Sequence, residues 1–141
     1  MKPTGRPVGI QLAITSKAVA RAFGAALADA GGSMPTWLVL RSLKEQDRSS
    51  QLDLARAIGV EGPTLTRHID TLEESGIVER HRDADDRRAI RVELTPAGEQ
   101  LYAELLKAAM AFGKRLTAGL DPKELERFTD TLARLEQNVR D

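Results

Sequence analysis

The sequence predicts a mainly α-helical fold with a small β-hairpin wing, in which a winged helix-turn-helix core is flanked by N- and C-terminal dimerisation helices. Two short amphipathic segments meet at Gly59-Val60, and two strand-like runs follow them. Longer segments with helical periodicity lie at both ends. We divide the chain into an N-terminal dimerisation helix (1–32), the winged module (33–95) and C-terminal dimerisation helices (96–141), which together form one compact domain.

The composition is that of an ordinary soluble protein, with 41% hydrophobic and 30% charged residues among 141. No apolar run approaches the length of a transmembrane helix, and the N-terminus lacks the pattern of a secretory signal, so we expect a cytoplasmic protein without membrane partners. The absence of cysteine excludes disulfides and thiolate metal sites. His68 and His81 are thirteen residues apart and flanked by arginines, so we expect neither a metal site nor a cofactor.

The N-terminal part of the chain predicts two helices. The first runs from Val8 to about Asp29 and is stopped by Gly31-Gly32, and the second opens near Pro35. Their apolar faces are predicted to contain Leu12, Val19, Phe23 and Leu27 in the first helix, and Trp37, Leu40 and Leu43 in the second.

The helix-turn-helix is predicted from two short helices, residues 51–58 and 61–75. Ser50 is a suitable N-cap for the first helix, and Gly76 ends the second. We expect the first helix to bury Leu52, Ala55 and Ile58. The second has an apolar stripe of Leu65, Ile69 and Leu72, with Thr64, Thr66, Arg67, His68, Asp70 and Thr71 on its opposite face.

Two strands are predicted over 77–83 and 89–94, because Ile90, Val92 and Leu94 alternate with charged residues. Helices follow at Thr95-Pro96 and at a capping box that begins at Asp121. The last helix has an apolar seam that needs a partner, and a homodimer is the simplest one. This dimerisation seam consists of Leu125, Phe128, Leu132, Leu135 and Val139.

The charge balance gives no general preference for nucleic acid, since 21 basic and 21 acidic residues cancel. Residues 61–95 hold six arginines against nine acidic residues, although five of these arginines fall within 80–91. Any affinity for DNA therefore depends on where individual arginines are placed, and we expect it to be salt-sensitive.

These features resemble the MarR family of bacterial transcriptional regulators. The resemblance implies a homodimer with interlocked terminal helices that binds a pseudo-palindromic operator and mostly represses nearby genes. It also implies release from DNA when a small aromatic or phenolic anion binds between the dimerisation helices and the DNA-binding module. Gly98 stands where a capping-box glutamate would, as it does in the family. The matching residues are Leu52-x-Leu54-Ala55, Thr64-Leu65-Thr66-Arg67, Leu72-Glu73-x-x-Gly76-Ile77-Val78-x-Arg80, Asp83-x-x-Asp86-Arg87-Arg88 and Leu94-Thr95-x-x-Gly98.

Candidate DNA contacts lie on the second helix of the motif. Arg67 is expected to bond a guanine edge or a phosphate, and its alternative is an ion pair with Glu74 or Asp70. Thr64 and Thr66 suit phosphates or thymine methyl groups, or else they cap the helix or are merely polar surface.

Two further residues of the motif helices are candidates. His68 either contacts DNA or is a partly packed residue of the helix. Gln51, at the start of the first helix, is placed for a phosphate contact.

The wing supplies the other candidates. Arg87 is expected to enter a narrow minor groove, although a solvated arginine is the alternative. Arg88 either bonds phosphate or pairs with Asp86 or Asp83. Asp86 and Arg80 are expected to orient the wing and its arginines.

The effector pocket leaves fewer traces in the sequence. Lys17 and Arg21 lie one helical turn apart and suit a carboxylate, or else they are solvated. Trp37 either lines a pocket or fills the core. A winged module that contacts another protein instead of DNA remains an alternative function. No nucleophile elbow, phosphate loop or metal-ligand set points to an enzyme.

Overall fold

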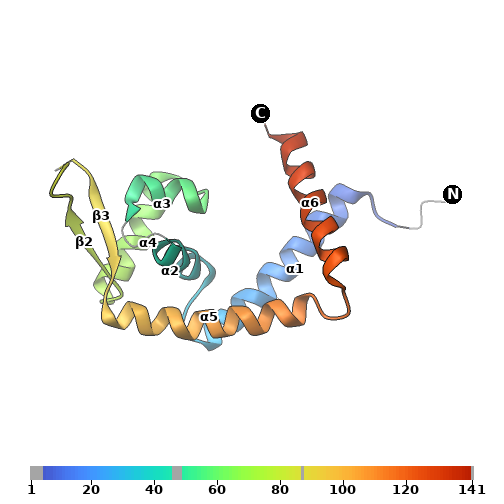
Figure 1. The fold of residues 1–141 in the computed structure, drawn as a ribbon, viewed down its shortest axis with the longest axis horizontal. Helices are drawn as coiled ribbons and strands as arrows, with labels where there is room; N and C mark the ends of the chain where they lie inside the picture. Colours follow the sequence, from blue (N-terminus) through green and yellow to red (C-terminus); the bar gives the residue numbers. More distant parts are fainter. Residues whose placement is uncertain (1–4, 46–48, 87, 141) are drawn as a thin grey trace. The chain divides into compact units, whose positions relative to one another are not determined.

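A computed structural model describes residues 5–45, 49–86 and 88–140, and it confirms the predicted fold class (Figure 1). The chain forms two compact units, Met1–Ala109 and Met110–Asp141. The helices are α1 (Val8–Asp29), α2 (Met34–Glu45), α3 (Gln51–Ile58), α4 (Gly62–Glu74), α5 (Pro96–Leu116) and α6 (Pro122–Val139). The strands are β1 (Ser49–Ser50), β2 (Val78–Arg82) and β3 (Ile90–Leu94).

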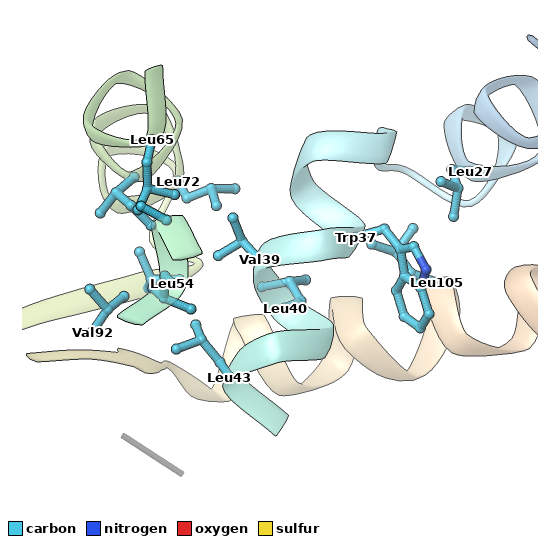
Figure 2. Close-up of a cluster of buried hydrophobic side chains, with 13 residues drawn as sticks. Leu27, Trp37, Val39, Leu40, Leu43, Leu54, Leu65, Leu72, Val92 and Leu105 are labelled. Carbon is cyan, nitrogen blue, oxygen red and sulfur yellow. The ribbon is translucent and has the colours of Figure 1, made fainter. Parts of the chain in front are cut away.

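The core of the first unit is built around α2, whose side chains reach in both directions (Figure 2). Trp37 stacks on Tyr102 of α5 with ring centroids 5.8 Å apart, and Lys44 pairs with Glu99 at 3.0 Å. These contacts hold α2 against α5. The predicted buried positions Leu27, Leu40, Leu43, Leu65, Ile69 and Leu72 are confirmed. The core also contains Val39, Leu54, Val78, Val92 and Leu105.

The sheet has three strands in the order β1-β3-β2, and both pairings are antiparallel. The hairpin of β2 and β3 was expected, but β1 was not. Residues 49–50 pair with Val92 and Arg91 of β3. Two residues are too few to produce a period of alternation, so the sequence pattern does not reveal such a strand.

The ends of the motif helices follow the expected chemistry, with one error in the buried face of α3. Ser50 Oγ accepts a hydrogen bond from the Asp53 amide at 3.1 Å, and Gly59 ends α3 in the left-handed conformation. Leu54, rather than Leu52, fills the core, and Leu52 is 60% exposed. In a helix of only eight residues either leucine gives an apolar stripe with Ala55, so the periodicity does not decide between them.

The junction between the hairpin and α5 is tightly closed around Thr95. Its amide donates to the Ile77 carbonyl at 3.1 Å, its hydroxyl donates to the Gly76 carbonyl, and its oxygen accepts from the Gly98 amide at 3.0 Å. A Cβ at Gly98 would lie 2.1 Å from the Ile77 carbonyl oxygen. This position therefore requires glycine for space, which explains the missing capping-box glutamate.

In the second unit, α6 begins with the predicted capping box. Asp121 Oδ1 accepts from the amides of Lys123 (2.7 Å) and Glu124 (3.2 Å), and the Glu124 carboxylate accepts from the Asp121 amide at 3.4 Å. None of residues 122–139, all of which the structure describes, is buried. No helix in the described part of the chain is both long enough and apolar enough to cross a membrane.

Candidate nucleic-acid interface

Helix α4 presents one apolar and one polar face, and Arg67 lies on the polar one. Arg67 is exposed and makes no side-chain hydrogen bond or ion pair with another described residue. Asp70, one of the two carboxylates considered as its partner, pairs with Arg80 instead. The Arg67 guanidinium is therefore available for an external ligand.

Thr66 and Gln51 lie at the contact between α3 and α4. The Gln51 side-chain amide donates to Thr66 Oγ1 at 3.3 Å, and that hydroxyl donates to the Gly62 carbonyl at 3.0 Å. The Gln51 Oε1 atom is buried and has no hydrogen-bond partner among the described residues. These two residues thus brace the helix-turn-helix elbow, while Thr64 and His68 are half-buried on α4.

Arg80 joins the wing to α4. Its guanidinium contacts the Asp70 carboxylate, its Nε lies 3.9 Å from Glu73 Oε1, and its backbone amide donates to Glu73 Oε2 at 3.2 Å. The expectation was that Arg80 orients the wing. In the structure its partners are acidic residues of α4, so it positions β2 relative to that helix.

The tip of the wing is shaped by aspartate side chains. Asp86 Oδ1 accepts from the Arg88 amide at 3.0 Å, and Asp83 Oδ1 accepts from the Asp85 amide at 2.9 Å. Asp86 therefore holds the backbone amide of Arg88, whose side chain is exposed. Arg87, the expected minor-groove residue, lies outside the described residues.

The pKa of Asp83 is displaced by its neighbours in the turn. The hydrogen bond from the Asp85 amide, followed by that from Arg91 at 2.8 Å, holds the Asp83 pKa below its ordinary value. Both interactions stabilise the ionised carboxylate. The turn is thus stabilised by a charged aspartate at neutral pH.

The residues expected to form an effector pocket are not brought together in a described cavity. Lys17 and Arg21 are exposed on α1, whereas Trp37 is 6% exposed and belongs to the core. Sequence reasoning missed an open cavity of about 530 Å³ beside the elbow of α3 and α4, lined in part by Leu52 and Arg56. The sequence feature that could have revealed this cavity is Leu52, which was predicted to be buried but borders the cavity instead.

The seam of α6 remains largely uncovered. Phe128 and Val139 are 55% and 81% exposed, and Leu125, Leu132 and Leu135 are half-buried. A row of large apolar side chains at this exposure is typical of a face that is covered by another chain.

Helices α3 and α4, with a β-hairpin that Arg80 joins to α4, define the class of the protein as a winged helix-turn-helix. A sequence model of the MarR family matches residues 33–90. The crystal structure of the transcriptional regulator PA3341 is similar, with 36% identity over 94% of this chain and 98% of that one and a TM-score of 0.82. The chain belongs to the MarR family, which consists of transcription regulators and not of enzymes.

Two more distant structures share the fold. BpsR of Bordetella bronchiseptica, whose DNA binding is regulated by 6-hydroxynicotinic acid, has 23% identity over 100% of this chain and 99% of its own, with a TM-score of 0.85. A mutant MarR from E. coli, complexed with operator DNA, has 22% identity over 92% of this chain and 93% of its own, with a TM-score of 0.84.

Proposed function

We propose that this protein is a sequence-specific DNA-binding transcriptional regulator that represses its target genes as a homodimer. The observation that carries the proposal is the exposed Arg67 on α4, a helix whose other face is anchored in the core. Such a helix fits the major groove, where arginine recognises guanine or binds phosphate. A regulator of this kind acts in the cytoplasm, where bacterial DNA lies.

The other residues of the helix-turn-helix take supporting parts. Thr64 and His68, half-buried beside Arg67, approach phosphates or bases at the edge of the contact. Thr66 and Gln51 keep α3 and α4 at a fixed angle through their mutual hydrogen bond. Their contact with DNA is therefore secondary to that bracing role.

The wing contributes a second contact in the minor groove. Arg87 enters the groove, and Arg88, whose backbone is held by Asp86, bonds an adjacent phosphate. Arg80 sets the distance between these arginines and α4 through its contacts with Asp70 and Glu73.

Dimerisation places two such modules on one operator. The segments 1–32 and 96–141 supply the contacts, and the seam of Leu125, Phe128, Leu132, Leu135 and Val139 is covered by the partner chain. Each subunit then reads one half-site, and half-sites one helical turn apart are separated by roughly 34–36 Å.

A small aromatic acid releases the protein from DNA. This proposal rests on the family and on the regulation of DNA binding of BpsR by 6-hydroxynicotinic acid. In this chain Lys17 and Arg21, both on α1, supply positive charge for the carboxylate of the effector. Trp37 is buried against Tyr102 in the core, so it does not contact the effector directly in this proposal.

The test is a fluorescence-anisotropy titration of the untagged protein against the DNA upstream of its own gene, with unrelated DNA of equal length as the control. We expect tighter binding to the upstream DNA. Arg67→Ala should weaken that binding by about 1–3 kcal/mol, which is roughly 5- to 150-fold. Arg41→Ala, which removes an exposed guanidinium from α2, should leave it within about twofold.

Three results distinguish the parts of the proposal. Equal loss in both arginine variants would indicate general electrostatics instead of a specific contact by Arg67. Equal, weak binding to both DNA fragments would contradict autoregulation and favour the protein-contact alternative. Failure of 6-hydroxynicotinic acid and related aromatic acids to lower the anisotropy would remove the effector from the proposal and leave DNA binding intact.

A further inference from the structure

Three metal-ligating side chains meet on one face of the wing. Glu79 and His81 lie two residues apart on β2 and so share a face, and Glu93 of β3 is the register partner of Glu79. His81 Nε2 is 2.8 Å from Glu93 Oε1 and 3.3 Å from Glu79 Oε2. One ligand atom from each residue falls within 4.8 Å of the other two.

These separations are close to the dimensions of a tetrahedral zinc site. Zinc binds histidine nitrogen and carboxylate oxygen at roughly 2.0–2.2 Å, so neighbouring ligand atoms at tetrahedral angles lie roughly 3.3–3.5 Å apart. The distances from His81 Nε2 are within about 0.7 Å of this range, and the ligand atoms of Glu79 and Glu93 lie within 4.8 Å of each other, so the exposed side chains need to shift by roughly 1 Å to surround an ion. No movement of the backbone is required, because the strand register already places the three side chains together.

Solvent reaches the cluster. The side chains of Glu79, His81 and Glu93 are 57%, 50% and 32% exposed. A hollow of about 560 Å³, lined in part by His81, Arg91 and Glu93, adjoins them. A fourth ligand can therefore be water, in the arrangement of zinc sites that have three protein ligands.

The charges on this face favour a cation. Two glutamates that face each other across a strand pair repel, and a positive charge between them relieves the repulsion. Arg91, opposite His81, is bonded through its Nε to Asp83 at 2.8 Å, so a neighbouring carboxylate already compensates its guanidinium. Arg91 therefore opposes a metal ion less than an isolated arginine would.

We propose that Glu79, His81 and Glu93 bind one divalent transition-metal ion of the zinc type on the wing. One imidazole nitrogen with carboxylate oxygens suits zinc and its neighbours, whereas magnesium and calcium prefer ligand sets made entirely of oxygen. No metal site was expected from the sequence, because His81 and His68 are thirteen residues apart. The structure shows that the strands, and not the second histidine, supply the partners of His81.

The test uses the untagged full chain after dialysis against a chelator and requires no DNA. Zn²⁺ is titrated by calorimetry, and Co²⁺ is followed by its visible absorption, which reports tetrahedral coordination. We expect one ion per chain. His81→Ala should weaken the binding by about tenfold or more, because it removes the only nitrogen ligand. His68→Ala, which removes the other histidine of the chain, is the matched control and should bind as the parent does.

Glu93→Gln is the second variant. It keeps the size of the side chain but gives a poorer ligand, so it should also weaken binding while the circular dichroism spectrum stays unchanged. Three results would each overturn the proposal. They are equal Zn²⁺ binding by His81→Ala and the parent, loss of binding only in His68→Ala, and no saturable binding up to about 100 µM Zn²⁺, the range of a weak site.

Discussion

Replacing Gly98 by alanine tests the closed junction between the wing and α5. The added Cβ would lie 2.1 Å from the Ile77 carbonyl oxygen and 3.2 Å from Leu94 Cδ2. Carbon and oxygen normally approach to about 3.3 Å, so either the start of α5 or the turn at Ile77 must move by roughly 1 Å. The atom that is struck belongs to the backbone, so a rotamer change cannot relieve the clash.

The magnitude follows from the hydrogen bonds at the same place. A shift of that size weakens the bonds from Thr95 to the carbonyls of Ile77 and Gly76, each worth about 0.5–1.5 kcal/mol. Overpacking a filled site destabilises the folded state by about 1–3 kcal/mol, whereas alanine stabilises a helix by about 0.5–1 kcal/mol relative to glycine. We expect Gly98→Ala to lower the free energy of unfolding by about 2 kcal/mol.

The assay is urea unfolding followed by circular dichroism, at one fixed protein concentration because a dimer's stability depends on it. With a urea slope of about 1–3 kcal/mol per M, the midpoint should fall by about 1 M. Gly24→Ala is the control, since a Cβ there meets nothing within 4 Å in the described chain and should stabilise α1 slightly. A Gly98→Ala midpoint equal to that of the parent would refute the steric argument.

Three further outcomes are expected. Leu40→Ala, at a fully buried position, should cost about 2–5 kcal/mol in the same unfolding assay, and a loss below about 1 kcal/mol would mean that the core of α2 is not closely packed. Leu132→Glu on the α6 seam should halve the mass in light scattering, whereas Ala133→Glu on the exposed side should not; a Leu132→Glu dimer would contradict the seam. Because the Asp83 pKa is lowered in the folded state, its contribution to stability is complete above about pH 4 and is lost as the pH falls through the lowered value. An NMR titration of the Asp83 carboxyl should give a midpoint below about 3.9, and a higher midpoint would contradict the assigned hydrogen bonds.

The sequence predicted the helices well because their signals are local. Caps such as Ser50 and Asp121 and the left-handed glycines Gly59 and Gly76 act on their immediate neighbours, and each occurs where it was expected. The strand of residues 49–50 was missed because its stability comes from pairing with β3, which is remote in sequence.

The candidate site was predicted less completely, since it depends on which side chains meet. The sequence indicated that Arg67 is exposed, but not that Asp70 is taken by Arg80 or that Gln51 is bonded to Thr66. Such pairings are set by the angle between elements, which no local pattern encodes. The same reason hid the cluster around His81, whose partners are adjacent only in the folded sheet.

The link through Arg80 has a consequence for the evolution of operators. If α4 and the wing are held at one spacing, a subunit samples major- and minor-groove positions at a constant offset along the duplex. Base substitutions at the two positions then weaken binding independently of each other. A single base pair inserted between the two positions moves one of them by roughly 3.4 Å along the duplex relative to the other, and also rotates it around the helix axis. Under the proposed mode of binding, we therefore expect operators of this protein to tolerate a base substitution better than a change in the spacing between the two contacts.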